Sequence, residues 1–524
     1  MKAIKNTYNI VHAMTSSQKR YFKRYMQLYS NQEKEIVQIF NIINKHKKFS
    51  EEKIKTDLKQ KKIKHTSVKL RYLFDTILDS LAAFEVHSES IDAKLERSIR
   101  HARILFEKNF LDKSWSILKK AKEEAKVYER FNILSTILSL ELKVLKYGYQ
   151  YRENGKKILK VVDEKIELYN VLKNFNEYEA LNTKIVNIQL QENKKPLEQL
   201  RGLLQNEPLL QGITNSLSHN STQLYYAALT NIHVELGEYE KALELLQEQV
   251  DLCQEYPKIF KGEFFVRVIN NLLILSLQID NRKVFFKYIK LIEEKRSENK
   301  SKTESALLMY VKYHILIKYY VLNEQSKNIG QLLREVDEQI EIHNNYLQQR
   351  SQIVLTFYQA VACIYYNHQD GLLDYLNKID TLIDSTNTPI EQLMAKILAM
   401  FAHLQLGNKS VVDSLIRAVK YFLKKDENQA YNTVFVKLLL KHLFKMNKVL
   451  HTRQKGIKDD ALLNMDRDLK KHMDKDAAQI TSTFNIFIWI ESQLKEKNII
   501  DIMWNKEEKI YEINMADIEN EAAE

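Results

Sequence analysis

Apolar residues recur three, four and seven positions apart along nearly the whole chain, which is the spacing of one face of an α-helix. The set Ala242, Leu245, Leu246 and Val250 is one example. Alternation of apolar and polar residues, the pattern of a β-strand, occurs on both sides of a polar tetrapeptide within residues 499–513. That stretch forms either a short β-hairpin or a continuing helix. The rest of the pattern predicts an all-α fold.

Short polar breaks divide the helical pattern at regular intervals. Nine of them are 39–45 residues apart and fall near Asn109, Arg152, Asn193, Gly237, Asp280, Asn323, His368, Gly407 and Asn447. This spacing predicts an array of two-helix units, with each helix about 25 Å long at a rise of 1.5 Å per residue. One hairpin cannot bury its own apolar face, so the units must stack and the ends of the array must be capped.

Glycine and proline are scarce, which agrees with long helices and brief turns. The chain has 10 Gly and 4 Pro in 524 residues, under 3%, where average usage is about 12%. Large sheet folds need many of these residues for their tight turns and are therefore excluded. Apolar residues make up 44% of the chain, enough for a large core.

The pattern suggests three regions. Residues 1–90 are expected to form a basic helical N-terminal domain or cap, and residues 91–456 the helical repeats. Residues 457–524 are expected to form a C-terminal helical cap, with the possible β-hairpin and an acidic tail.

Residues 225–256 read YYAALTNIHVELGEYEKALELLQEQVDLCQEY, and GEYEKALELL resembles the turn and second helix of a tetratricopeptide repeat. The matching positions are Leu229, Gly237, Tyr239, Ala242 and Leu246, whereas Thr230 and Gln249 depart from the motif. The N-terminal segments SSQKRYFK and VKLRYLFDTILDSL resemble uncharacterised Bacteroidota proteins of this type. The resemblance implies an α-solenoid, a right-handed superhelix of tetratricopeptide-like hairpins with helical caps.

The resemblance also implies a binding surface, because the first helices of such hairpins line a concave groove that holds a peptide or a protein. Matched positions place Asn231 and Glu235 in this groove, and the extrapolated register adds Arg267, Asn270 and Asn271. Asparagine amides suit the hydrogen-bonding groups of a peptide backbone, and Arg267 suits an acidic group. The alternative is an ordinary polar helix surface.

Positive charge is concentrated at the N-terminus. The net charge is +12, and residues 1–90 hold 18 Lys/Arg against 9 Asp/Glu. A candidate basic patch, which would neutralise phosphates, consists of Lys45, Lys47, Lys48, Lys59, Lys61, Lys62, Lys64 and Arg71. The short helices around it are compatible with a helix-turn-helix module. The patch contains a single arginine, however, and base readout favours arginine, so a solvated lysine-rich face is the alternative.

Motifs for catalysis and metal binding are absent from the sequence. Glycine-rich phosphate loops, HExxH, CxxC and GxSxG do not occur, and we therefore expect no enzyme, no metal and no cofactor. Cys253 and Cys363 are 110 residues apart and are expected to be buried, reduced thiols. No run of 18 apolar residues and no export signal occur, which predicts a cytoplasmic protein without a membrane span.

The leading hypothesis is a non-catalytic scaffold or adaptor that binds a protein or peptide in the groove. The alternative is a nucleic-acid-binding regulator, in which the basic N-terminal domain contacts DNA or RNA and the repeats act as a sensor. The sequence identifies neither the partner nor the oligomeric state.

Overall fold

The computed structural model describes residues 2–27, 33–46, 49–63, 65–85, 90–147, 154–190, 196–260, 262–298, 301–322, 326–383, 389–424, 428, 431–452, 454–473, 477, 480–481, 484–499 and 502. These residues contain helices and no strand, which confirms the all-α prediction. The chain divides into two compact units, residues 1–261 and 262–524.

The first unit begins with a bundle of five helices: α1 (Lys2–Ala13), α2 (Ser16–Met26), α3 (Glu33–Lys45), α4 (Glu51–Gln60) and α5 (Thr66–Glu85). These helices are amphipathic and bury one apolar face each. Phe22, Ile39, Phe40, Leu73 and Ile77 form the centre of a shared core and are fully buried. The first 85 residues therefore possess a hydrophobic core of their own.

The first unit continues with α6 (Ile91–Glu107), α7 (Leu111–Val127), α8 (Phe131–Leu145), α9 (Gly155–Leu190), α10 (Pro196–Asn206), two 3₁₀ turns (Pro208–Leu210 and Ile213–Asn215), α11 (His219–Glu235) and α12 (Tyr239–Glu255). Two apolar cores hold these helices together. One joins α6, α7, α8 and the start of α9, and the other joins the end of α9 to α10 and α11.

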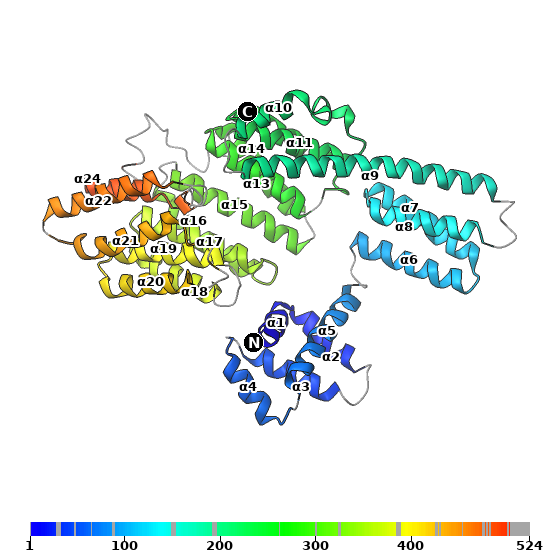
Figure 1. Ribbon diagram of the computed structural model, residues 1–524, viewed down its shortest axis with the longest axis horizontal. Coiled ribbons are helices and arrows are strands. Elements are labelled where there is room, and N and C mark those ends of the chain that lie inside the picture. Colours follow the sequence, from blue (N-terminus) through cyan, green and yellow to red (C-terminus); the bar gives the residue numbers. More distant parts are fainter. Residues whose placement is uncertain are drawn as a thin grey trace. The chain divides into compact units, whose positions relative to one another are not determined.

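Helix α9 differs from the prediction of helices about 25 Å long. It has 36 residues and therefore spans about 54 Å, running from α7 and α8 to α10 and α11 (Figure 1). After Gly155 it contains no glycine or proline that would end it. The second helix of one expected hairpin and the first helix of the next are thus a single helix.

The second unit contains α13 (Glu263–Gln278), α14 (Arg282–Glu298), α15 (Lys302–Leu322), α16 (Ser326–His343), α17 (Gln349–Tyr365), α18 (Gln369–Ile383), α19 (Pro389–Gln405), α20 (Lys409–Phe422), α21 (Val434–Val449), α22 (Lys455–Lys471) and α24 (Ile486–Lys495). Helices α13 and α14, α15 and α16, α17 and α18, and α19 and α20 pack as pairs. The first helices also pack on one another, α13 on α15, α15 on α17 and α17 on α19.

Six connections between helices have the same three-residue turn. The middle residue has a left-handed backbone, with φ between 48° and 74°, and is Asn109, Glu129, Gly237, Asp280, Asn367 or Gly407. The residue after it donates its backbone N–H to the carbonyl five residues earlier at 2.8–2.9 Å. This is the Schellman arrangement, which satisfies carbonyl groups left free at the helix end.

The predicted breaks at Asn109, Gly237, Asp280, His368 and Gly407 fall on these turns and are confirmed. The break predicted near Asn447 falls at the turn that follows α21, which ends at Val449, and is confirmed to within a few residues. The Asn447 amide is buried and donates to the carbonyl oxygen of Lys409 and to Asp413, both at 2.9 Å. Arg152, Asn193 and Asn323 lie outside the described residues.

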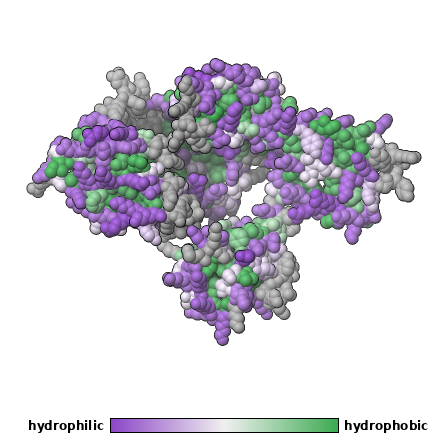
Figure 2. Space-filling view, viewed as in Figure 1, coloured by the Kyte–Doolittle hydropathy of each residue, from purple (hydrophilic) through white to green (hydrophobic). Residues whose placement is uncertain are grey.

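The C-terminal alternatives are described only in part. Within residues 499–513, Ile499 and Ile502 are described, and both are helical and buried. The other residues of this stretch, and the acidic tail, lie outside the described residues. Among the helices that the structure describes, none combines the length and apolar character needed to cross a bilayer. On the face shown in Figure 2, hydrophilic residues predominate and apolar residues gather in separate patches.

Candidate functional site

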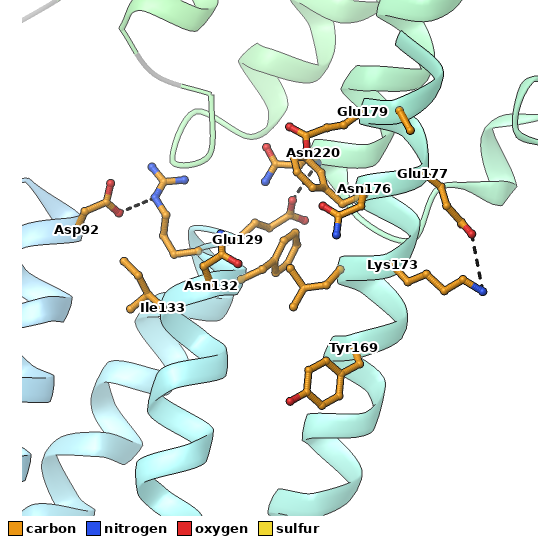
Figure 3. Close-up of a pocket in the computed structure, with 15 residues that line it drawn as sticks. Asp92, Glu129, Asn132, Ile133, Tyr169, Lys173, Asn176, Glu177, Glu179 and Asn220 are labelled. Atoms are coloured by element: carbon orange, nitrogen blue, oxygen red, sulfur yellow. Dashed lines mark hydrogen bonds and ion pairs between the residues drawn. The ribbon is translucent and has the colours of Figure 1, made fainter. Parts of the chain in front are cut away.

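An open cavity of about 1060 Å³ lies in the first unit, where the start of α8, the middle of α9 and the start of α11 meet (Figure 3). The cavity exists because α9 changes its packing partner at this point. Ile158, Val161 and Leu168 are buried in the core with α8, whereas Leu181 and Ile185 are buried in the core with α11. Between the two cores, one side of α9 is left uncovered.

Glu129 connects the two sides of the cavity. Its carboxylate accepts backbone hydrogen bonds from His219 and Asn220, both at 2.9 Å, and so binds the first turn of α11. The hydroxyl of Ser218 accepts the next N–H, from Ser221, at 3.0 Å. A helix N-terminus has free N–H donors and a partial positive charge. The carboxylate accepts hydrogen bonds from the donors and interacts favourably with the charge. The turn between α7 and α8 thereby holds a helix that begins 90 residues later.

The cations that line the cavity already have acidic partners. Arg130 donates from Nε to Asp92 at 2.7 Å, and Lys173 lies 3.7 Å from Glu177. These pairs neutralise much of the charge around the opening. The cavity therefore does not have the strong positive charge that a phosphate-rich ligand needs.

Three asparagines contribute uncharged polar groups to the same space. Asn132 comes from α8, Asn176 from α9 and Asn220 from α11, and Figure 3 shows them around the cavity. Each primary amide offers two donors and one acceptor oxygen. The three amides together can form hydrogen bonds with both N–H and C=O groups of a ligand.

The apolar part of the cavity continues along α9. Phe131 and Leu172 line the cavity, and Tyr169 lies at its edge. From Tyr169, an exposed apolar stripe extends toward the start of the helix, with Ile166 and Leu159 at spacings of three and seven residues. The exposed fractions of Leu159, Ile166 and Tyr169 are 64%, 56% and 53%. Exposed apolar side chains on one helix face mark a surface that can bind another protein.

The five predicted groove residues do not line this cavity. Asn231 and Glu235 lie on α11 in the first unit, and Glu235 is exposed and accepts a hydrogen bond from Gln189 at 3.2 Å. Asn231 is half-buried. Arg267, Asn270 and Asn271 lie on α13 in the second unit. The structure thus assigns the predicted groove residues to two different units.

Their environments on α13 also differ. Arg267 and Asn271 are exposed, and the guanidinium of Arg267 lies 5.2 Å from the centre of the Phe264 ring. Asn270 points inward, and its buried Oδ1 atom has no hydrogen-bond partner among the described residues. Arg267 is thus accessible, whereas Asn270 is partly enclosed.

The predicted basic patch is exposed where it is described. Lys45, Lys59, Lys61, Lys62 and Arg71 are exposed, whereas Lys47, Lys48 and Lys64 lie outside the described residues. On α5, Arg71 is followed on the same face by Asp75 and Asp79, which are also exposed. Two carboxylates at helical spacing repel phosphates, so this face of α5 is a poor surface for nucleic acid.

Both cysteines are free and buried, as predicted. Burial raises the pKa of Cys253 and of Cys363 to about 12, so neither thiol is a nucleophile near neutral pH. In the part of the chain that the structure describes, no group of three or more His, Cys, Asp or Glu residues is arranged to hold a metal ion.

The cavity was not predicted from the sequence because it depends on the continuity of α9. The signal that was available is the absence of glycine and proline between residues 156 and 190, across an expected loop.

No protein-family model, no curated protein and no solved structure matches the chain.

Proposed function

We propose that this protein is a non-catalytic scaffold that binds a segment of a partner protein in the α8–α9–α11 cavity. The observation that carries the proposal is the combination of three asparagine amides with an apolar stripe, in a cavity whose cations are already paired. Amides that donate and accept match a peptide backbone, and the stripe matches apolar side chains. Because Cys253 and Cys363 form no disulfide, which suits a reducing compartment, we propose that the protein is cytoplasmic.

We further propose that the two-helix units form an α-solenoid of the tetratricopeptide-like kind. Two observations support this architecture. The same Schellman turn recurs within hairpins, and in the second unit the first helices of consecutive hairpins pack side by side. In a solenoid the first helices line the concave face. Asn231 and Glu235 therefore remain candidate groove residues of the first unit, and Arg267, Asn270 and Asn271 of the second.

Affinity purification followed by mass spectrometry tests the scaffold and its cavity together. The wild type is compared with the double variant Ile166→Lys/Asn176→Lys, and Ile342→Lys is the matched control because Ile342 on α16 is 65% exposed. We expect the wild type and the control to retain the same partner and the double variant to lose it. If the double variant retains that partner, the cavity is not its site; if the wild type retains no partner, the scaffold proposal is wrong.

Two further measurements separate the remaining alternatives. The variant Arg267→Glu/Asn231→Ala should weaken partner retention if the predicted groove contributes. For the nucleic-acid alternative, binding to duplex DNA and to RNA is titrated with salt. Exposed lysines at Lys59, Lys61 and Lys62 favour that alternative, and the two aspartates of α5 oppose it. Absence of binding at about 100 mM salt would exclude a phosphate-driven interaction.

A further inference from the structure

A cluster of two tyrosines, one histidine and one lysine lies in the second unit, on α15 and α17. Tyr310, His314 and Lys318 follow one another at four-residue intervals and share one face of α15. The His314 ring stacks with Tyr310 at 5.6 Å between ring centres, and lies 4.8 Å from the ring of Tyr358 on α17. The Nζ atom of Lys318 lies 4.9 Å from the same Tyr358 ring.

The ammonium group of Lys318 has no carboxylate partner among the described residues. Lys318 is half-buried, and burial lowers its pKa. Two other enclosed lysines, by contrast, are paired: Lys122 lies 3.0 Å from Glu141, and Lys312 lies 2.8 Å from Glu293. A charge that is withdrawn from water without a counter-ion is costly, and an anion from a ligand would remove that cost.

His314 contacts both tyrosine rings of the cluster and is itself incompletely hydrogen-bonded. Its side chain is 7% exposed, and its buried Nδ1 atom has no hydrogen-bond partner in the described ranges. Burial, and then the nearby charge of Lys318, lower the pKa of His314 to about 3, so the imidazole is neutral. A neutral imidazole carries its proton on one ring nitrogen, and with the proton on Nδ1 it has a donor that no described residue uses.

The cluster occupies a repeated position. Asn270, His314 and Tyr358 are separated by 44 residues each, and α13 packs on α15 as α15 packs on α17. They are therefore equivalent residues of three successive hairpins. Asn270 likewise has a buried oxygen without a partner, and the exposed Arg267 has no acidic partner among the described residues. This row thus combines unused polar groups with unpaired positive charge.

We propose that Tyr310, His314, Lys318 and Tyr358 form a binding subsite for a carboxylate side chain, an Asp or Glu of an acidic segment in the partner. The subsite deepens the proposed scaffold function and rests on it. The carboxylate pairs with the Lys318 ammonium, draws it from the Tyr358 ring and accepts a hydrogen bond from the Nδ1–H group of His314. One ammonium and one neutral donor match the single charge of a carboxylate better than the double charge of a phosphate.

Calorimetric titration with two capped peptides, hexaglutamate and hexaglutamine, tests the subsite at 150 mM salt. The wild type should bind hexaglutamate at least about tenfold more tightly than hexaglutamine, the gain of one charge-assisted hydrogen bond. Lys318→Met should lose this preference. Lys287→Met is the matched control, because Lys287 also lies over a tyrosine ring, 5.1 Å from Tyr288, but on the exposed face of α14.

The outcomes distinguish the subsite from the scaffold. Equal binding of the two peptides by the wild type, or an unchanged preference in Lys318→Met, would overturn the subsite. If Lys287→Met also loses the preference for hexaglutamate, the preference reflects nonspecific charge attraction, and this result too would overturn the subsite. Lys318→Met removes a half-buried charge without a carboxylate partner and should fold at least as stably as the wild type, which thermal unfolding checks. The scaffold proposal is tested separately, by whether the protein retains a partner through the α8–α9–α11 cavity in the affinity purification.

Discussion

At the scale of single residues, Glu129 combines a strained backbone with a favourable side-chain contact. Its φ of 48° lies in the left-handed region, which costs a residue with a Cβ atom about 1 kcal/mol. Its carboxylate holds the start of α11 through two hydrogen bonds. The strain is tolerated because the turn aims the carboxylate at the helix 90 residues further on.

Substitutions at Glu129 separate these two contributions. Glu129→Ala keeps the strain and removes the cap, and should lower the free energy of unfolding by about 1–3 kcal/mol. Glu129→Gly removes both, so its loss should be smaller by about 1 kcal/mol. Urea unfolding measures the difference. Asn109→Gly is the control, since asparagine tolerates the left-handed region and the change should cost or gain less than about 0.5 kcal/mol. Equal stability of Glu129→Ala and the wild type would contradict the capping role.

At the scale of elements, α9 is a site where stability and binding are expected to oppose each other. Asn176 is exposed in the helix interior and lines the cavity. Asparagine is a poor helix former, so Asn176→Ala should raise the free energy of unfolding by about 0.5 kcal/mol while weakening partner retention. Asn170→Ala is the matched control on the same helix, because Asn170 is exposed outside the cavity. It should give the same gain in stability and leave retention unchanged; a loss of retention in both variants would contradict the role of Asn176.

The helices and turns also show how much of the fold can be predicted from the sequence. The turns at Asn109, Gly237, Asp280 and Gly407 were predictable because polar or glycine residues that accept a left-handed backbone interrupt an apolar period. The break predicted near Asn447 falls two residues early, since the Asn447 amide is still within α21 and donates to the start of α20. The cavity and the Lys318 cluster were not predictable, since both depend on which helices become neighbours. Arg267 is exposed, and its role in a groove stays a prediction.

At the scale of the whole molecule, buried thiol and phenol groups make the free energy of unfolding sensitive to alkaline pH. Burial raises the pKa of Cys253 and Cys363 to about 12 from 9.0, and that of Tyr178 and Tyr365 to about 12 from 10.0. The unfolded chain releases these protons at lower pH than the folded chain. Stability from these groups is therefore fully present below pH 9 and is lost as the pH rises toward 12.

The corresponding measurement is the urea midpoint of unfolding at pH 8, 9, 10 and 11. We expect a progressive decrease above pH 9. The double variant Cys253→Val/Cys363→Val should decrease less steeply between pH 9 and 10, because two of the groups that titrate only in the unfolded chain are gone. A midpoint that stays constant from pH 8 to pH 11 would contradict the burial of these protons.

Helix α9 has one more consequence, which concerns the tolerance of the first unit to insertions. Because one continuous helix enters two cores, the number of residues between Leu168 and Leu181 sets the rotation of one core relative to the other. One inserted residue would turn the second core by about 100° around the helix axis and misalign every buried side chain beyond it. Seven inserted residues would restore the rotation to within about 20° and only lengthen the cavity. The helix thus fixes the rotation between the two cores. Insertions into α9 should be tolerated only when they add close to a whole number of helical turns.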